Sequence, residues 1–141
     1  MDSLYVAESV SNLICAIADD VKERFKTIKV RWTLEEAIVL FDVYFQNGFD
    51  PKVSDEKLME VSRLYRNRAQ KLDLLVDSKF RNLPGLRMQL GCIHYVVTDG
   101  KEGLPNASQA FYQTWSLHKT EPKRFDQILK QFYQDYDVRM H

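Results

Sequence analysis

Apolar residues recur at intervals of three and four positions along most of the chain, which is the period of an amphipathic α-helix. The first such stripe runs from residue 3 to residue 28, with charged residues on the opposite face. Its members are Val6, Val10, Leu13, Ile14, Ile17, Val21, Phe25 and Ile28. The pattern predicts one long amphipathic helix at the start of the chain, which either covers the domain's own core or drives self-association.

Helix-capping signals divide the rest of the chain into further helices. The segment Thr33-Leu34-Glu35-Glu36 has the spacing of a capping box, and Asn47-Gly48 ends the helix that it opens. Residues suited to the N-cap position also precede the next three predicted helices: Ser54, Asn82 and Asn106. We expect the helix after Ser54 to continue into, or to reopen in, the basic segment 66–79. A last helix is expected to begin near Glu121-Pro122.

These elements predict an all-α fold, a single compact domain of five to six helices with an added long N-terminal helix. Residues 1–29 would form the added helix, and residues 30–141 the helical domain. Only Lys29–Trp32 has a composition that could form a short strand. The helical spacing of the larger aromatic residues indicates core packing rather than a base-stacking role for Trp32, Tyr44, Phe80 and Trp115.

The composition indicates an ordinary globular protein of one domain. The chain has 141 residues, of which 45% are hydrophobic and 28% charged, with a formal net charge of zero. No apolar run approaches the length of a membrane span, so we expect a soluble, cytoplasmic protein with no membrane partner. The two cysteines, Cys15 and Cys92, are too far apart for a zinc-binding motif and do not suggest a disulfide scaffold.

The positive charge is concentrated in one part of the chain. Residues 61–90 hold seven basic and two acidic residues, whereas residues 1–60 are acidic on balance. A local basic surface, rather than net charge, is what binds a polyanion such as nucleic acid. The alternative is that these side chains are solvated on the polar faces of helices.

No pattern in the chain is typical of an enzyme. Cys92 and His94 lie two positions apart on a predicted helix, where they face different directions and would not share a metal ion. The phosphate-binding glycine motifs and the nucleophile-elbow motif are absent from the sequence. We therefore expect no catalytic activity, no cofactor and no metal.

Several sequence blocks resemble one family. They are Trp32-Thr33-Leu34-Glu35-Glu36, Val61-Ser62-Arg63-Leu64-Tyr65, Phe80-Arg81-Asn82-Leu83-Pro84-Gly85-Leu86, Gly103-Leu104 and the helix around Trp115. In this order, over about residues 31–117, they resemble the N-terminal domain of McrA-type, HNH-containing, modification-dependent restriction endonucleases. The block that begins at Phe80 is the most specific of them.

The resemblance implies a non-catalytic domain that binds duplex DNA, often with modified cytosine, and targets a fused or separate nuclease in restriction or phage defence. The sequence departs from the family at Gln89, where the family usually has lysine, and it contains no HNH block. The first 28 residues lie outside the family core.

The residue chemistry supplies candidate DNA contacts. Arg81 and Asn82 precede a predicted helix whose free amides favour phosphate, and Arg87 and Gln89 lie where a helix inserted in the major groove meets base edges. Other cations of the basic stretch would contact phosphates. The candidate DNA-binding residues are Arg63, Arg66, Arg68, Lys71, Lys79, Arg81, Asn82, Arg87 and Gln89.

Two other functions remain open from the sequence. The chain could be a protein-interaction or oligomerisation subunit of a defence complex, with a homodimer formed through residues 3–28. It could also be a helix-turn-helix-like regulator that binds unmodified DNA.

Overall fold

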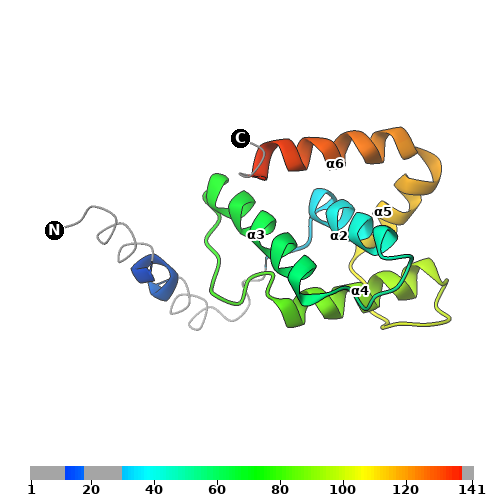
Figure 1. Cartoon of the computed structure of the whole chain (residues 1–141), viewed down its shortest axis with the longest axis horizontal. Coiled ribbons are helices and arrows are strands. Elements are labelled where there is room, and N and C mark those ends of the chain that lie inside the picture. Colours follow the sequence, from blue (N-terminus) through cyan, green and yellow to red (C-terminus); the bar gives the residue numbers. More distant parts are fainter. Residues whose placement is uncertain (1–11, 18–29, 138–141) are drawn as a thin grey trace.

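The computed structural model describes residues 12–17 and 30–137, and these residues are entirely helical or irregular, without strands. Five helices follow one another in the larger segment: α2 (Leu34–Gln46), α3 (Asp55–Lys71), α4 (Leu83–Val97), α5 (Gln109–Thr120) and α6 (Pro122–Tyr136) (Figure 1). Residues 12–17 are also helical, whereas the rest of the predicted helix 3–28 lies outside the described residues. The predicted all-α class is confirmed, and the suggested strand is wrong for residues 30–32, which are irregular.

Helix α2 is the centre of the domain, because it packs against each of the other four helices. Figure 1 shows α6 on one side of it and α4 on the other. Five consecutive side chains of α2, residues 37–41, are completely buried. The core that surrounds them includes Leu58, Leu64, Tyr65, Leu86, Leu90, Ile93, Phe111, Phe125 and Phe132. A helix buried on all sides explains the apolar run in the middle of α2.

Most of the predicted helix starts are confirmed. Thr33 and Glu36 form the capping box of α2, Ser54 caps α3, and the Asn82 side chain accepts the backbone N–H of Gly85 at the start of α4. The predicted cap of α5 is wrong: Ser108 occupies the N-cap position, and Asn106 lies two residues earlier in a left-handed turn (φ 71°).

The basic segment 66–79 is only partly helical. Helix α3 ends at Lys71, and residues 72–82 form an irregular connection to α4. The end of α3 is a Schellman motif, in which the N–H of Leu74 donates to the carbonyl of Ala69 at 2.8 Å and Asp73 adopts a left-handed conformation (φ 55°). The polypeptide therefore turns away from the helix axis within the segment that the sequence predicted as helix.

Helices α2 and α4 end in the same motif with different residues at the left-handed position. Gly48 (φ 70°) follows the C-cap of α2, and Asp99 (φ 55°) follows that of α4. The next N–H groups, of Phe49 and Gly100, donate to carbonyls five residues earlier. Glycine adopts this conformation without the steric strain that a side chain introduces.

We predict that Asp99→Gly raises the free energy of unfolding by about 0.5–1 kcal/mol, because it removes that strain. The matched substitution Gly48→Ala should lower it by about 1 kcal/mol. A Cβ at Gly48 would meet no atom within 4 Å, so the loss would come from the backbone alone. Urea denaturation of both variants measures these changes, and destabilisation by Asp99→Gly would contradict the prediction.

Candidate nucleic-acid interface

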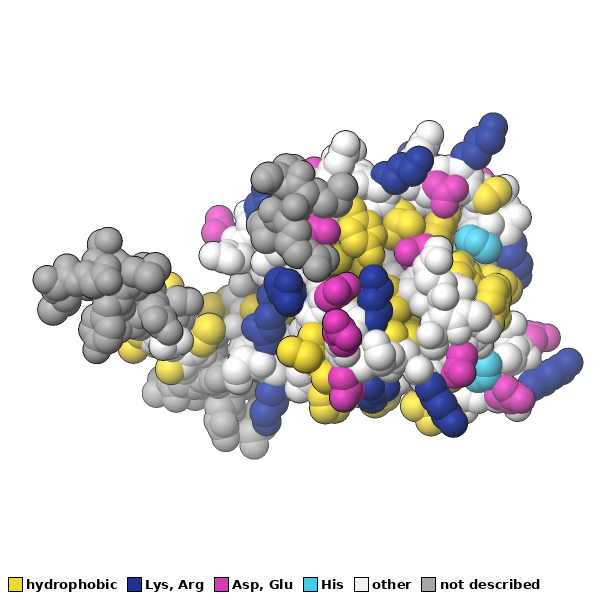
Figure 2. All heavy atoms as spheres, viewed as in Figure 1, with side chains coloured by type: hydrophobic (Ala, Val, Ile, Leu, Met, Phe, Trp, Pro, Cys, Tyr) yellow, Lys and Arg dark blue, Asp and Glu magenta, His cyan; other side chains and the backbone are white. Residues whose placement is uncertain are grey.

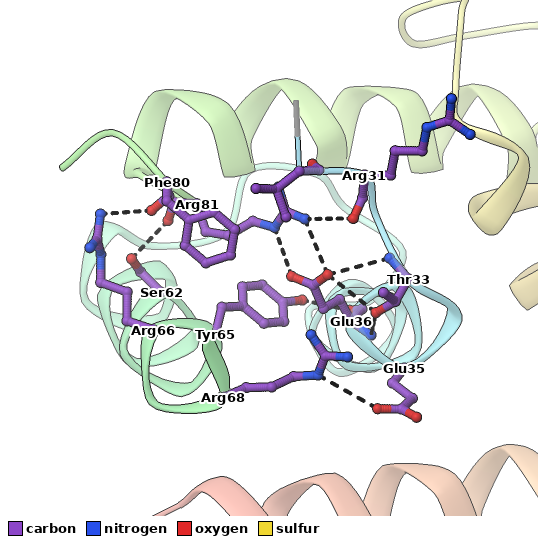
Figure 3. A network of polar contacts seen from close by, with 11 residues as sticks. Arg31, Thr33, Glu35, Glu36, Ser62, Tyr65, Arg66, Arg68, Phe80 and Arg81 are labelled. Carbon is purple, nitrogen blue, oxygen red and sulfur yellow. Dashed lines mark hydrogen bonds and ion pairs between the residues drawn. The ribbon is translucent and has the colours of Figure 1, made fainter. Parts of the chain in front are cut away.

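Arg81, the central residue of the predicted DNA contact, lies inside the domain and forms an ion pair with Glu36. Its Nε donates to Glu36 Oε2 at 2.7 Å, and its Nη2 donates to Oε1 at 3.1 Å (Figure 3). The two side chains are only 8% and 1% exposed. Such a bidentate pair uses the planar shape of the guanidinium, and it leaves little of Arg81 available to a ligand.

The remaining polar atoms of this pair are also hydrogen-bonded. Glu36 Oε1 accepts the backbone N–H of Thr33 at 3.3 Å as part of the capping box, and Arg81 Nη2 donates to the carbonyl of Arg31 at 3.2 Å. The Arg81 guanidinium lies 4.1 Å from the ring centroid of Trp32. A buried ion pair is stable only when its remaining donors and acceptors are satisfied in this way.

Side chains of helix α3 hold the connection to α4 by donating hydrogen bonds to its backbone carbonyls. Ser62 donates from its hydroxyl to the carbonyl of Arg81 at 2.7 Å. One turn later, Arg66 Nη2 donates to the carbonyl of Phe80 at 2.9 Å (Figure 3). The same nitrogen donates to the carbonyl of Ser78 at 2.7 Å. Arg66 therefore fixes the connection, but its positive charge faces no carboxylate within ion-pair distance among the described residues.

Three other predicted cations have partners elsewhere on the domain. Arg68 Nε lies 3.6 Å from Glu35 Oε2, and this arginine side chain is only 11% exposed. Lys71 Nζ donates to the carbonyl of Asp135 on α6 at 3.1 Å. Arg87 pairs with the Asp55 carboxylate and donates to the carbonyl of Val53 at 3.0 Å. Arg68 and Arg87 thus join other parts of the fold through carboxylates.

Two predicted cations are exposed with their side chains unbonded to the part of the chain that the structure describes: Arg63 and Lys79. Arg63 lies three residues before Arg66, and hence on a neighbouring part of the same helix surface. Lys79 stands between Ser78 and Phe80, whose carbonyls accept Arg66. Arg63 and the backbone of Lys79 therefore both neighbour Arg66, and we call these three residues the cationic surface. The carboxylate of Asp77 lies beside it, where it accepts the backbone N–H of Lys79 at 3.0 Å.

The two remaining candidates, Asn82 and Gln89, are uncharged and do not belong to the cationic surface. Asn82 Oδ1 accepts the N–H of Gly85 at 3.0 Å, so its side-chain oxygen already caps α4. Gln89 is half-buried on α4. The structure accordingly places the nine predicted residues in several environments rather than on one continuous face.

Arg31 is an exposed cation that the sequence analysis did not select. Its side chain points away from Glu36 in Figure 3, while its carbonyl accepts Arg81. It stands outside the basic stretch 61–90, and its position directly before the Trp32-Thr33 block was the one signal that could have drawn attention to it.

His94 connects α2, α4 and the connection that follows α4. Its Nδ1 lies 2.7 Å from the hydroxyl of Tyr44, and its Nε2 lies 2.8 Å from a carboxylate oxygen of Glu102. Burial raises the pKa of the Tyr44 phenol, and the carboxylates of Asp50 and Glu102 raise it further. The arrangement ties an exposed loop to the core through a neutral phenol.

The aromatic residues that the sequence assigned to the core are packed there. Tyr44 and Phe80 are buried, and Trp32 and Trp115 pack against the core from its edge. Trp32 contacts Tyr65 edge-on with ring centroids 5.5 Å apart. Their rings are part of the hydrophobic interior, as predicted, although Trp32 and Phe80 lie outside the helices.

No group of three potential metal ligands occurs among residues 12–17 and 30–137, and no helix within these ranges is long and apolar enough to span a membrane. Comparison of the chain with family models, with curated proteins and with solved structures finds no match.

We predict that Arg81→Ala lowers the free energy of unfolding by about 3–5 kcal/mol, because it leaves the Glu36 carboxylate buried without its partner. Arg81→Lys should recover only part of this loss, since lysine cannot form the bidentate pair. The control is Arg87→Ala, which breaks a more exposed ion pair and should lower it by less than about 1 kcal/mol. Guanidinium denaturation of the three variants measures this, and equal losses for Arg81→Ala and Arg87→Ala would contradict the buried role.

From the buried phenol of Tyr65, we predict that the domain loses stability in alkaline solution. Its buried hydroxyl donates to the carbonyl of Glu36 at 2.6 Å, and burial raises the pKa of this phenol well above its usual value. Above about pH 10 the unfolded chain loses the phenol proton while the folded chain keeps it. Stability should therefore fall with rising pH, by up to about 1.4 kcal/mol per pH unit for each such tyrosine.

Tyr65→Phe should make that fall less steep, whereas Tyr112→Phe, at an exposed position on α5, should leave it unchanged. Urea denaturation at a series of pH values between neutral and strongly alkaline measures the slope for each variant. An unchanged slope in Tyr65→Phe would show that the phenol does not carry the effect.

Proposed function

We propose that residues 30–137 form a non-catalytic domain that binds duplex DNA through the cationic surface of Arg63, Arg66 and Lys79. The observation that carries the proposal is that Arg66 contacts the backbone on both sides of Lys79, that Arg63 lies one turn before Arg66 on α3, and that none of the three has an ion-pair partner among the described residues. Arg68, Arg81 and Arg87 are held by carboxylates and contribute much less to the external field.

The expected contacts are to the phosphate backbone. Lysine and arginine side chains at an exposed surface neutralise phosphates and release counterions, which makes binding dependent on salt. Lys and Arg side chains alternate with Asp and Glu over the face shown in Figure 2. We therefore infer a small number of phosphate contacts rather than the broad basic face of a non-specific DNA-coating protein.

The resemblance in the block around Arg81 supports a narrower role, recognition of DNA that carries modified cytosine and the targeting of a nuclease. The Glu36–Arg81 pair also gives the residues of that block a structural role, because the pair fixes Arg81 and the start of α4 relative to α2. In our proposal, this block holds the cationic surface in position, and Arg63, Arg66 and Lys79 make the contacts.

We predict that the double substitution Arg63→Ala/Lys79→Ala weakens binding to duplex DNA by about tenfold and lowers the salt dependence by about two counterions. Both side chains are exposed, so the variant should fold normally. The matched control is Lys123→Ala/Arg124→Ala at the start of α6, far from the connection 72–82 in Figure 1. Fluorescence anisotropy with a labelled duplex, at low and raised NaCl, measures both quantities.

Equal losses of DNA affinity in the two double variants would show that the cationic surface does not bind DNA. Duplexes of one sequence, with and without 5-methylcytosine, test the narrower role, for which tighter binding of the methylated duplex is expected. Equal affinity would favour a regulator of unmodified DNA. Binding to neither duplex would favour the protein-interaction function.

A further inference from the structure

A hollow opens between the end of α4 and α5, two helices that pack against each other. Its volume is about 500 Å³, which lies within the range of small-molecule sites in proteins. Val96 and Val97 of α4 and Trp115 of α5 supply its apolar lining, to which the exposed Tyr112 adds a second aromatic ring. We call this space the α4–α5 hollow.

The apolar lining of the hollow is held in place by the core. Val96 is buried, and the ring of Trp115 stacks against Phe41 of α2 with centroids 6.5 Å apart and an angle of 20° between the planes. Trp115 also stacks against His118, at 5.9 Å and 8°. A ring fixed by its neighbours offers a contact surface that a ligand does not have to order, which favours binding.

Two side chains of opposite charge line the hollow without pairing. Asp99 follows the C-cap of α4, and Lys119 lies in the last turn of α5 with its Nζ 5.1 Å from the ring centroid of Trp115. Neither forms an ion pair with the other or with a third residue in the described part of the chain. Both charges are therefore available to a ligand.

The two charges determine which ligand chemistry fits. Asp99 stands at the C-terminal end of α4, where the helix dipole is negative, so this side of the hollow attracts an ammonium group. Lys119 attracts a carboxylate. A ligand with one charge alone would leave the other side chain unmatched, and the valines and Trp115 favour a hydrophobic, preferably aromatic, group. A molecule that satisfies all three conditions is a zwitterion with an aromatic ring.

We propose that the α4–α5 hollow binds a free amino acid with an aromatic side chain. The ammonium group lies against Asp99, the carboxylate against Lys119, and the ring against Trp115. The hollow is at the opposite end of α4 from the connection 72–82, about 20 Å away along a helix of 15 residues, and no residue of the cationic surface lines it. The inference is therefore independent of DNA binding.

NMR titration of the isotope-labelled full chain with L-phenylalanine tests the proposal. We expect saturable shifts of the Trp115 indole N–H and of the backbone amides of residues 96–99, with a dissociation constant below about 1 mM. Phenylethylamine lacks the carboxylate and phenylpropionate lacks the ammonium group, so each should bind about fivefold more weakly. Absence of these shifts would overturn the proposal, as would equal or tighter binding of either analogue.

Two variants assign each charge to its partner on the ligand. Asp99→Asn should weaken L-phenylalanine binding about fivefold without weakening phenylpropionate, and asparagine also suits the left-handed backbone at this position. Lys119→Gln should weaken L-phenylalanine binding about fivefold and leave phenylethylamine binding unchanged. Circular dichroism checks that both variants are folded.

The matched controls are Asp126→Asn and Lys130→Gln, which remove the same charges at exposed positions of α6 outside the hollow. Both should bind L-phenylalanine as the wild-type chain does. Equal losses of affinity in the controls and in the hollow variants would overturn the proposal, because the effect would then come from the overall charge of the protein. Unchanged L-phenylalanine binding in Asp99→Asn and Lys119→Gln would overturn it as well.

Discussion

The fold depends on a buried charge, the carboxylate of Glu36 at the start of the central helix. Removing a carboxylate from water is costly unless cations and hydrogen-bond donors replace the solvent. Arg81 supplies two donors to it, and the capping residue Thr33 supplies others. Because Arg81 also binds the carbonyl of Arg31, one network joins the segment before α2, the first turn of α2 and the end of the connection to α4.

The position of the cationic surface follows from this network. Arg81 adopts a left-handed backbone (φ 48°), a conformation that costs an arginine about 1–2 kcal/mol and persists only where surrounding contacts require it. The carbonyl of Arg81 then accepts a hydrogen bond from Ser62. The carbonyls of Ser78 and Phe80 accept hydrogen bonds from Arg66. Lys79, which lies between them, is left exposed beside α3. A buried pair therefore determines which cations a ligand could reach.

Local sequence signals predicted most of the fold, whereas long-range pairing was beyond them. Thr33, Ser54 and Asn82 were recognised as caps because a cap is read from the few residues that follow it. Asn106 was mistaken for a cap because asparagine suits a left-handed turn equally well. Glu36 and Arg81 are 45 positions apart, and nothing local distinguishes an arginine that faces inward from one that faces solvent. Sequence reasoning therefore selected the basic stretch as the candidate site but could not separate its buried cations from its exposed ones.

A count of basic residues overstates the field that a basic stretch produces. Three of the seven basic residues in 61–90 are held by carboxylates, each of which cancels much of its partner's charge. The basic residues that pair with no carboxylate among the described residues are Arg63, Arg66, Lys71 and Lys79, on α3 and on the connection 72–82. A polyanion would therefore meet a few cations beside this connection rather than the seven that the sequence places in residues 61–90.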